Sequence, residues 1–287
     1  MHATDFGLTL IIANPAAQSG AAREVAERLQ RFMDMTARAS QFDLVLTERM
    51  GHAKELAAQA QGYRTVIALG GDGVIHEVVN GLMTQDEAVR PALAILPVGS
   101  GNDYAETLGM AYSVPTAVTE ILRFQTVRAD VGRVNGRYFA ETLSFGLDAA
   151  IALDTMDRRQ KSGRAGTMLY LESAVDQLFH HLQVFSFKMD VLGAEPGCAP
   201  HPEWDDAYLV AVQVGPTYGG HFRITPKARL DDGLLDICWA TPELSSMRAL
   251  ALLLRARGGK HTGSDHIHFR RASSLVLDFE EEPPAQM

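Results

Sequence analysis

A glycine-rich turn with one carboxylate at its centre is the part of this sequence with the clearest chemical potential. Residues 68–82 read Ala-Leu-Gly-Gly-Asp-Gly-Val-Ile-His-Glu-Val-Val-Asn-Gly-Leu, an apolar run that leads through glycines into helical periodicity. Glycines at a helix start let backbone N–H groups approach a phosphate closely, and the helix N-terminus adds partial positive charge. A carboxylate there repels phosphate unless a magnesium ion or a protein cation lies between them. Asp72 is therefore a candidate magnesium or catalytic residue, with helix capping as the alternative.

A second loop of the same kind follows the next apolar run. Residues 96–105 read Leu-Pro-Val-Gly-Ser-Gly-Asn-Asp-Tyr-Ala and again bring glycines, a hydroxyl, an amide and a carboxylate to a helix start. Taken alone, Ser100, Asn102 and Asp103 are typical helix caps. Two such loops after neighbouring strands are harder to explain as caps, so we expect both to face one phosphate-binding cleft.

Three other motifs do not fit these residues. A dinucleotide-binding G-x-G-x-x-G would need glycine at His76, and a zinc-protease H-E-x-x-H would need histidine at Asn80. The P-loop pattern G-x-x-x-x-G-K-[ST] does not occur in the sequence. The motifs therefore disfavour a Rossmann dehydrogenase, a zinc protease and a P-loop enzyme.

The elements that carry both loops alternate between strand-like and helical patterns. Apolar runs typical of buried strands occur at 8–13, 42–47, 65–69 and 92–96. This rhythm predicts a parallel sheet covered by helices, with the ligand site at the carboxyl ends of the strands. From Asp130 the pattern changes to short alternating segments with hairpin turns such as Asn135-Gly136, which predicts a β-rich second domain. Within it we expect helices at Thr167–Leu182 and Ser245–Arg257 and an exposed loop at Gly193–Asp206.

Composition indicates the class of protein and its surroundings. Of the 287 residues, 46% are hydrophobic and 21% are charged, which is typical of a globular protein with a packed core. The net charge of −9 disfavours a general nucleic-acid binder, which needs a surplus of lysine and arginine. Cys198 and Cys238 are too few for a disulfide framework and favour a reducing cytoplasm. Every apolar run is shorter than the ~20 residues of a membrane helix, so we expect no transmembrane segment.

The two glycine loops together resemble the diacylglycerol kinase catalytic domain, which bacterial lipid kinases, sphingosine kinases and ceramide kinases share. The resemblance rests on Gly-Gly-Asp-Gly at 70–73, His-Glu-Val-Val-Asn-Gly-Leu at 76–82 and Pro-Val-Gly-Ser-Gly-Asn-Asp-Tyr-Ala at 97–105. It continues through most of the chain, in Asn14-Pro15, Ser19-Gly20, Thr47, Gly51-His52-Ala53, Asp130-Val-Gly132, Asn135–Phe139, Tyr218-Gly-Gly220, Pro226 and Asp231–Asp236.

The resemblance implies an α/β protein with two domains. Residues 1–128 would form a phosphofructokinase- or NAD-kinase-like α/β nucleotide-binding domain, and residues 129–287 a lipid-substrate domain with a β-sandwich fold. ATP would bind in the cleft between them. The implied activity is that of an ATP-dependent lipid kinase, which transfers the γ-phosphoryl group to the hydroxyl of a diacylglycerol-like or sphingoid-like lipid. The alternatives are a NAD kinase-like enzyme and a catalytically inactive protein that binds nucleotide or lipid.

The resemblance also implies roles for individual residues. Asp72 would lie beside the transferred phosphate, and Asp130 near the reacting hydroxyl. In bacterial relatives the corresponding segment holds a structural Mg²⁺, which implies Asp232 as a side-chain ligand and the carbonyls of Arg229 and Leu234 as backbone ligands. The residues expected to bind ATP are Asn14, Pro15, Ser19, Gly20, Thr47, Gly70, Gly71, Asp72, Gly73, His76, Glu77, Gly99, Ser100, Gly101 and Asn102.

Some details of the resemblance point to different acceptors. Val74 stands where the family usually has threonine, so a hydroxyl contact near the phosphates is missing. Ser100 in Gly-Ser-Gly-Asn is closer to the sphingosine kinases, whereas Asp103-Tyr104 is closer to the bacterial diacylglycerol kinases. The acceptor is left open, and we expect a lipid at the membrane surface, reached by a cytoplasmic protein that binds the membrane peripherally. A homodimer is compatible with the sequence but is not indicated by it.

Two further expectations concern charged segments. Arg158, Arg159, Lys161 and Arg164 form a basic cluster that either attracts anionic headgroups, at ~1 kcal/mol per charge, or belongs to a solvated loop, which we favour. Relatives carry the catalytic base, a glutamate, in an Asp-Gly-Glu turn after a strand and acidic loop similar to Leu275–Met287. The glutamates at 280–282 lack that turn. We therefore expect the base beyond Met287, in a continuation of roughly 20 residues that returns to the first domain.

Overall fold

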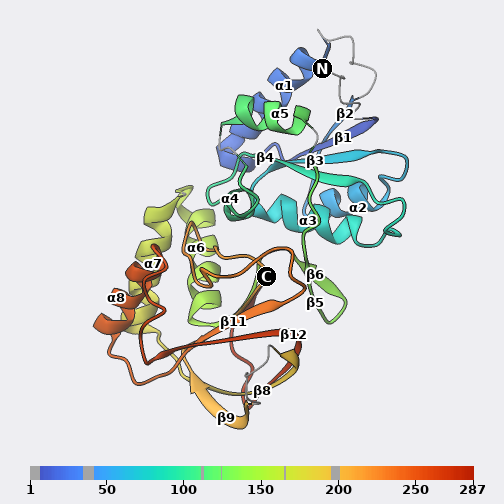
Figure 1. The fold of residues 1–287 in the computed structure, drawn as a ribbon. Helices are drawn as coiled ribbons and strands as arrows, with labels where there is room; N and C mark the ends of the chain where they lie inside the picture. Colours follow the sequence, from blue (N-terminus) through green and yellow to red (C-terminus); the bar gives the residue numbers. More distant parts are fainter. Residues whose placement is uncertain (1–6, 35–41, 111–112, 124, 165, 195–200) are drawn as a thin grey trace. The chain divides into compact units, whose positions relative to one another are not determined.

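The structure is a computed structural model that describes residues 7–34, 42–110, 113–123, 125–164, 166–194 and 201–287. It divides into two compact units (Figure 1). The first contains Met1–Val127 and Arg133–Phe139, and the second contains Arg128–Gly132 and Ala140–Met287. The chain thus exchanges a short segment between the units, which a single sequence boundary at residue 128 does not indicate.

The first unit is a parallel sheet between two layers of helices (Figure 1). Its strands pair in the order β2-β1-β3-β4, with the bounds β1 Thr9–Ala13, β2 Phe42–Leu46, β3 Thr65–Gly70 and β4 Ala92–Pro97. Its helices are η1 Ala17–Gly20, α1 Ala21–Asp34, α2 His52–Ala58, α3 Asp72–Leu82, α4 Asp103–Thr107 and α5 Val114–Arg123.

Apolar spacing explains why these helices cover the sheet. β1 and β3 are buried along their whole length, because side chains of a parallel sheet are covered on both faces. On one face α1 packs Ala22 and Ala26, four residues apart, into a core cluster that also contains residues of α5. On the other face α3 buries Ile75, Val78 and Leu82, which follow the i, i+3, i+7 pattern of an amphipathic helix (Figure 1).

A hairpin of β5 (Gly132–Val134) and β6 (Arg137–Phe139) supplies the exchanged segment of the first unit. Asn135 and Gly136 both have positive φ, so the hairpin turn predicted from the Asn-Gly pair is confirmed. Asn80 on α3 fastens this hairpin. Its amide donates to the carbonyl of Tyr138 at 2.8 Å, and its oxygen accepts the N–H of Tyr138 at 3.0 Å.

The second unit is built on an antiparallel sheet with the strand order β13-β7-β10-β11-β12-β8-β9. The strands are β7 Thr142–Gly146, β8 Phe185–Ala194, β9 His201–Ala207, β10 Leu209–Gln213, β11 Leu235–Ala240, β12 Ile267–Phe279 and β13 Ala285–Gln286. Three helices lie side by side against it in Figure 1: α6 Leu147–Ser162, α7 Thr167–His180 and α8 Ser246–Ala256. Phe222, Cys238 and Ala256 belong to the apolar cluster between helices and sheet.

The predicted fold class is confirmed, because a parallel α/β unit precedes a unit built on an antiparallel sheet. The predicted apolar strands correspond to β1 to β4, and the predicted helices of the second half correspond to α7 and α8. Within the described ranges, no helix is long and apolar enough to cross a membrane.

Two predictions about the second half are wrong. The exposed loop expected at Gly193–Asp206 is replaced at its two ends by the last residues of β8 and by β9, and residues 195–200 lie outside the described residues. The expected exposure is found in β9, an edge strand on which Glu203 and Asp206 are exposed. Residues 158–162, expected in a solvated loop, belong to the last turns of α6. Both segments are rich in charged residues, so their composition resembles that of a loop although backbone pairing makes them regular.

Candidate functional site

Loops after three strands meet at one edge of the first sheet. From β1 the chain turns to β2 on one side and later returns to β3 on the other, so β1 and β3 form a topological switch point, where open α/β sheets bind ligands. Asn14 follows β1, and its Cβ lies 3.7 Å from where a Cβ at Gly70 would lie. Thr47, after β2, donates its N–H to the carbonyl of Ala13 at 2.8 Å. The fold therefore brings the predicted residues of these loops together.

The two glycine loops touch through their backbones. A Cβ added at Gly99 would lie 2.4 Å from the Cα of Gly71, and one added at Gly71 would lie 3.0 Å from the Cα of Gly99. Neither distance leaves room for a side chain. Asn102 bends the second loop with a φ of 62°, a left-handed conformation that asparagine tolerates. Its amide donates to the carbonyl of Gly99 at 2.9 Å and so stabilises this close approach.

Asp72 is the first residue of α3, and its carboxylate faces the second glycine loop. The helix N-cap is Gly71, which offers no side chain, and Oδ2 of Asp72 accepts the N–H of Asn102 at 3.0 Å. A Cβ at Gly101 would lie 2.9 Å from Oδ2 of Asp72 and 3.0 Å from Oδ2 of Asp103. A side chain at this position would therefore displace one or both carboxylates. Oδ1 of Asp72 is buried and has no hydrogen-bond partner in the described part of the chain.

The electrostatics of this carboxylate pair suit a divalent cation. Burial, and then the negative charge of Asp103, raises the pKa of Asp72 from 3.8 to about 6, although the N–H groups of Asn102 and Tyr104 favour the ionised form. Mg²⁺ usually takes one or two protein carboxylates and completes its shell with water and substrate phosphates. The described residues contain no group of three or more His, Cys, Asp or Glu side chains arranged around a metal site. Asp72 and Asp103 supply the number of protein carboxylates that Mg²⁺ usually takes.

Two residues of α3 that were expected to bind ATP make other contacts. Glu77 accepts the N–H groups of Gly51 at 2.8 Å and Ala53 at 3.1 Å, so it caps the start of α2 and holds the turn after Thr47. His76 lies 3.4 Å from the amide of Asn80 along the same helix, and burial lowers the pKa of its imidazole. The other residues expected to bind ATP lie in the same loops or in the helices that follow them: Pro15 after β1, Ser19 and Gly20 in η1, Gly73 in the first turn of α3, and Ser100 before α4. The side chain of Ser19 lies outside the described residues.

In the second unit, Asp130 is bonded to the segment that was expected to hold magnesium. Its N–H donates to the carbonyl of Leu230 at 2.6 Å, and its Oδ2 accepts the N–H of Gly233 at 2.7 Å. These two bonds hold the Asp130 carboxylate in one orientation. The predicted catalytic carboxylates Asp72 and Asp130 thus belong to different compact units.

The side chain of Asp232 already has a cationic partner. Its Oδ2 forms an ion pair with the guanidinium of Arg271 on β12, whose Nε also lies 3.2 Å from Oδ1 of Asp236. Oδ1 of Asp232 accepts the N–H of Leu234 at 3.1 Å. The Arg229 side chain pairs with Asp231 at 3.1 Å. Asp232 would have to exchange the guanidinium of Arg271 for magnesium to serve as the expected side-chain ligand, and no step is assigned to that ion. The carbonyls of Arg229 and Leu234 stay predicted ligands, because side-chain pairing does not occupy them.

Comparison with known proteins identifies the family. A family model described as "Diacylglycerol kinase catalytic domain" matches residues 9–134, and one described as "YegS C-terminal NAD kinase beta sandwich-like domain" matches residues 141–287. The chain belongs to the diacylglycerol kinase catalytic-domain family. The resemblance carried by the two glycine loops is thereby confirmed.

Individual proteins similar to this chain are named as kinases of the same family. A diacylglycerol kinase of Staphylococcus saprophyticus is 27% identical over 240 residues, which cover 80% of this chain and 72% of the relative. A probable YegS-like lipid kinase of Pectobacterium atrosepticum is 32% identical over 228 residues, which cover 77% and 69%. The crystal structure of a diacylglycerol kinase from Bacillus anthracis str. Sterne matches with a TM-score of 0.77 and 25% identity, over 99% of this chain and 90% of that chain.

The second unit of the chain contains an apolar pocket that the sequence did not predict. α8, the start of α6 and strands β10 and β11 line it. α8 contributes Ala249, Leu252, Leu253 and Ala256, which repeat at i, i+3, i+4 and i+7. The inner face of α8 is therefore a wall of this pocket.

One wall of the pocket carries a buried carboxylate. Asp148 is 1% exposed, and the hydroxyl of Tyr218 is the polar group that interacts with its carboxylate, although their geometry falls short of a well-formed hydrogen bond. Burial raises the pKa of Asp148 from 3.8 to about 6, and the nearby Tyr218 hydroxyl offsets only part of this rise. Burial and the charge of Asp148 raise the pKa of the Tyr218 phenol further above its usual value. From sequence alone, Asp148 is indistinguishable from an ordinary residue at a helix start.

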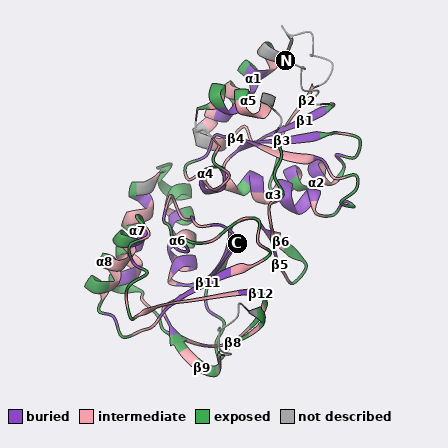
Figure 2. Ribbon diagram, viewed as in Figure 1, coloured by how far each residue is buried: buried purple, intermediate pink, exposed green. Residues whose placement is uncertain are grey.

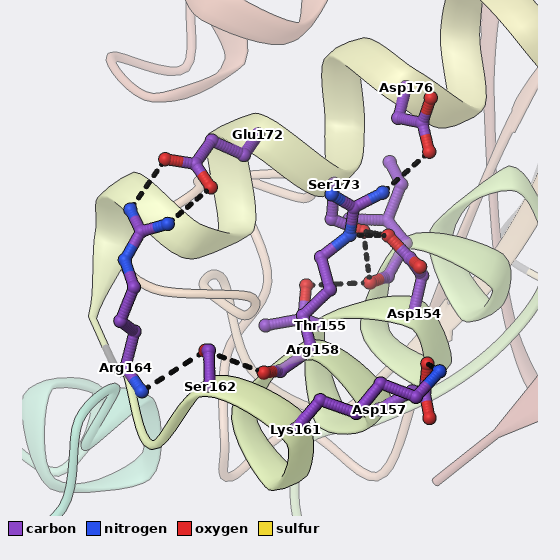
Figure 3. Close-up of polar contacts among 11 residues, drawn as sticks. Asp154, Thr155, Asp157, Arg158, Lys161, Ser162, Arg164, Glu172, Ser173 and Asp176 are labelled. Atoms are coloured by element: carbon purple, nitrogen blue, oxygen red, sulfur yellow. Dashed lines mark hydrogen bonds and ion pairs between the residues drawn. The ribbon is translucent and has the colours of Figure 1, made fainter.

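Carboxylates pair with three of the four cations of the basic cluster at the end of α6 (Figure 3). Its cations pair as follows: Arg158 with Asp154 and Asp176, Lys161 with Asp157, and Arg164 with Glu172. Two of these carboxylates lie one helical turn before their cations, which is the spacing for ion pairs along a helix. Arg159 is exposed and forms no ion pair within the described residues. The other three cations are paired and present little net charge to a lipid surface, so the cluster is a weaker candidate for membrane attraction than its four cations suggest.

Proposed function

We propose that this chain transfers the γ-phosphoryl group of ATP to a hydroxyl group of a diacylglycerol-like or sphingoid-like lipid. The observation that supports this most strongly is Asp72, whose buried, unpartnered oxygen lies where two glycine loops meet. Such a site offers backbone N–H groups to phosphate oxygens and carboxylates to the accompanying cation. Membership of a family of lipid kinases supports this class of reaction.

Phosphoryl transfer requires mainly the positioning of the reactants and the stabilisation of charge. We assign positioning to the glycine loops, and the N-terminus of α3 favours the negative phosphates. Mg²⁺ bound with the nucleotide would neutralise phosphate charge, and Asp72 and Asp103 would hold it. Asp72 must be ionised for this role. In the second unit we assign Asp130, whose orientation two backbone bonds maintain, to the acceptor hydroxyl.

The pocket behind α8 is the part of the second unit best suited to the hydrocarbon of the acceptor. Each CH₂ group that leaves water for an apolar site contributes about 0.8 kcal/mol to binding. Oδ2 of Asp148, which lacks a well-formed hydrogen bond among the described residues, would accept a hydrogen bond from a donor on the ligand. Because such lipids reside in bilayers, we infer that the protein works at a membrane surface as a peripheral, cytoplasmic protein.

An assay with labelled ATP and pure acceptors tests the proposed function. Wild type, Asp72→Asn and the control Asp86→Asn, an exposed aspartate of the same unit, are each incubated with diacylglycerol, sphingosine, ceramide and NAD. We expect labelled lipid from wild type and control, and roughly 100-fold less from Asp72→Asn, as for loss of a charge-stabilising group. Labelled NAD would support the NAD kinase alternative instead. Nucleotide binding without labelling of any acceptor would support an inactive binding protein.

A further inference from the structure

The outer face of α8 carries cations that carboxylates do not neutralise. Residues 244–264 contain Arg248, Arg255, Arg257 and Lys260 but no aspartate or glutamate, although the whole chain has a net charge of −9. All four side chains are exposed. Within the described part of the chain none of them forms an ion pair, in contrast to Arg158 and Lys161 of α6.

A cation from another segment joins this group. The N–H of Arg223 donates to the carbonyl of Ala256 at 2.9 Å, and its Cβ lies 3.8 Å from where a Cβ at Gly259 would lie. Arg223 is therefore held against the C-terminal end of α8. The partial negative charge of a helix C-terminus explains cations at this end of α8. It does not explain Arg248, which lies in the first turn, where a cation is unfavourable.

Large apolar side chains lie exposed beside these cations. On α8, Met247 is 65% exposed and Leu254 is 52% exposed, and their i, i+7 spacing places them on one face of the helix. On the neighbouring α7, Met168 and Phe179 are also exposed, and Figure 2 shows exposed segments along both helices. Single exposed apolar residues are ordinary. Apolar side chains among unpaired cations are typical of helices that lie in a membrane interface.

We propose that the outer face of α8 docks on a bilayer that contains anionic lipids. The docking surface consists of Arg223, Met247, Arg248, Leu254, Arg255, Arg257 and Lys260. Its charge complements anionic headgroups, and its long basic side chains can reach phosphates while the apolar ones enter the headgroup region.

The position of the pocket adds a second argument. The inner face of α8 lines the apolar pocket, so docking by the outer face would bring the pocket next to the bilayer from which a lipid must come. Within the described residues, the acidic residue that precedes α8, Glu243, does not pair with the cations of the docking surface. Its carboxylate Oε2 lies 3.9 Å from Nδ1 of His266. The inference rests on the proposed function and names the membrane surface that serves it.

Sedimentation of the full chain with lipid vesicles tests the docking surface. Vesicles of phosphatidylcholine are compared with vesicles in which about one third is phosphatidylglycerol, at low and high salt. The variant Arg248→Gln/Arg255→Gln should bind the anionic vesicles roughly 30-fold more weakly, since each cation near such a surface contributes ~1 kcal/mol. The control Arg23→Gln/Arg28→Gln removes the same charge from α1 and should bind like wild type. Equal binding to neutral and anionic vesicles, or equal losses in both double variants, would overturn the proposal.

Activity on lipid in neutral detergent micelles separates this inference from the proposed function. Arg248→Gln/Arg255→Gln should retain wild-type activity there, and loss of that activity would also count against a docking role. Wild type that binds anionic vesicles but phosphorylates no lipid would refute the proposed function and leave the docking surface supported. If wild type self-associates through this face without binding vesicles, and the double variant does not, the occupant is a second copy and the membrane proposal is wrong.

Discussion

Replacement of Asp148 by asparagine should stabilise the second unit at neutral pH. Ionised Asp148 is a charge in an apolar wall, and the Tyr218 hydroxyl offsets only part of the cost of burying it. Asparagine has nearly the same shape, so the packing around α6 should be preserved. Its carboxamide is uncharged at every pH, so the variant buries no charge in the folded state.

The pKa of Asp148 determines the size and sign of this effect. Burial raises the pKa in the folded protein from 3.8 to about 6. Below about pH 4 the carboxyl group is neutral in both states and costs nothing. Between about pH 4 and pH 6 the unfolded chain loses the proton that the folded protein keeps, so stability falls as pH rises. At 1.36 kcal/mol per pH unit the loss reaches ~3 kcal/mol and stays constant above pH 6.

Urea unfolding followed by tryptophan fluorescence measures this in the right part of the molecule, because Trp204 and Trp239 both belong to the second unit. We expect the gain in unfolding free energy of Asp148→Asn over wild type to grow from near zero at about pH 4 to ~3 kcal/mol at pH 7. The control Asp278→Asn removes an exposed carboxylate from β12 and should show no such trend. A gain that is the same at both pH values, or a variant that is less stable at pH 7, would refute the reasoning.

Further predictions concern the two glycine loops of the first unit and the ion pair of Asp232 with Arg271 in the second unit. Since Asp72 acts ionised and has a pKa of about 6, kcat/KM for ATP should fall about tenfold per pH unit below that value, and Asp103→Asn should move the midpoint to lower pH. A midpoint unchanged in Asp103→Asn would count against the carboxylate pair. Gly99→Ala should raise KM for ATP at least roughly tenfold because its Cβ meets the other glycine loop, whereas Gly263→Ala, which meets nothing within 4 Å, should be silent. Asp232→Asn should lower the thermal midpoint equally in magnesium and in EDTA, because its partner is a guanidinium; a wild-type midpoint that EDTA lowers to that of the variant would restore a structural metal.

The parts of the fold that the sequence predicted are those that local patterns control. A strand buried on both faces needs a continuous apolar run, so β1 to β4 were visible as such runs. The Asn135-Gly136 turn was predictable because its positive φ values restrict the residue types. The end of α6 was missed because its charged residues face solvent and one another, and periodicity shows a helix only when one face is buried.

In the candidate site, too, features that depend on neighbouring residues were predictable, whereas contacts between distant residues were not. Glycines clustered at 70–73, where a strand leads into a helix, indicate phosphate chemistry from sequence, because glycine lets backbone N–H groups approach a phosphate closely. The role of Glu77 as the cap of α2 could not be read from its motif, since its partners come from another part of the chain. The ion-pair partner of Asp232 could not be predicted either. Arg271 is distant in sequence and comes close to Asp232 only through the pairing of β11 with β12.

By itself, the sequence determined the family, the order of the elements and the chemistry of the glycine loops, because each depends on residues that are close together in the chain. Only the tertiary structure decided which groups are buried without partners and which charges are neutralised. Burial, and then the charge of Asp103 on another loop, raises the pKa of Asp72. Burial in a pocket wall assembled from several elements raises that of Asp148. Burial and electrostatic pairing depend on distances in space, so the cations of α6 and α8 look alike in sequence and differ only once the fold has placed their neighbours.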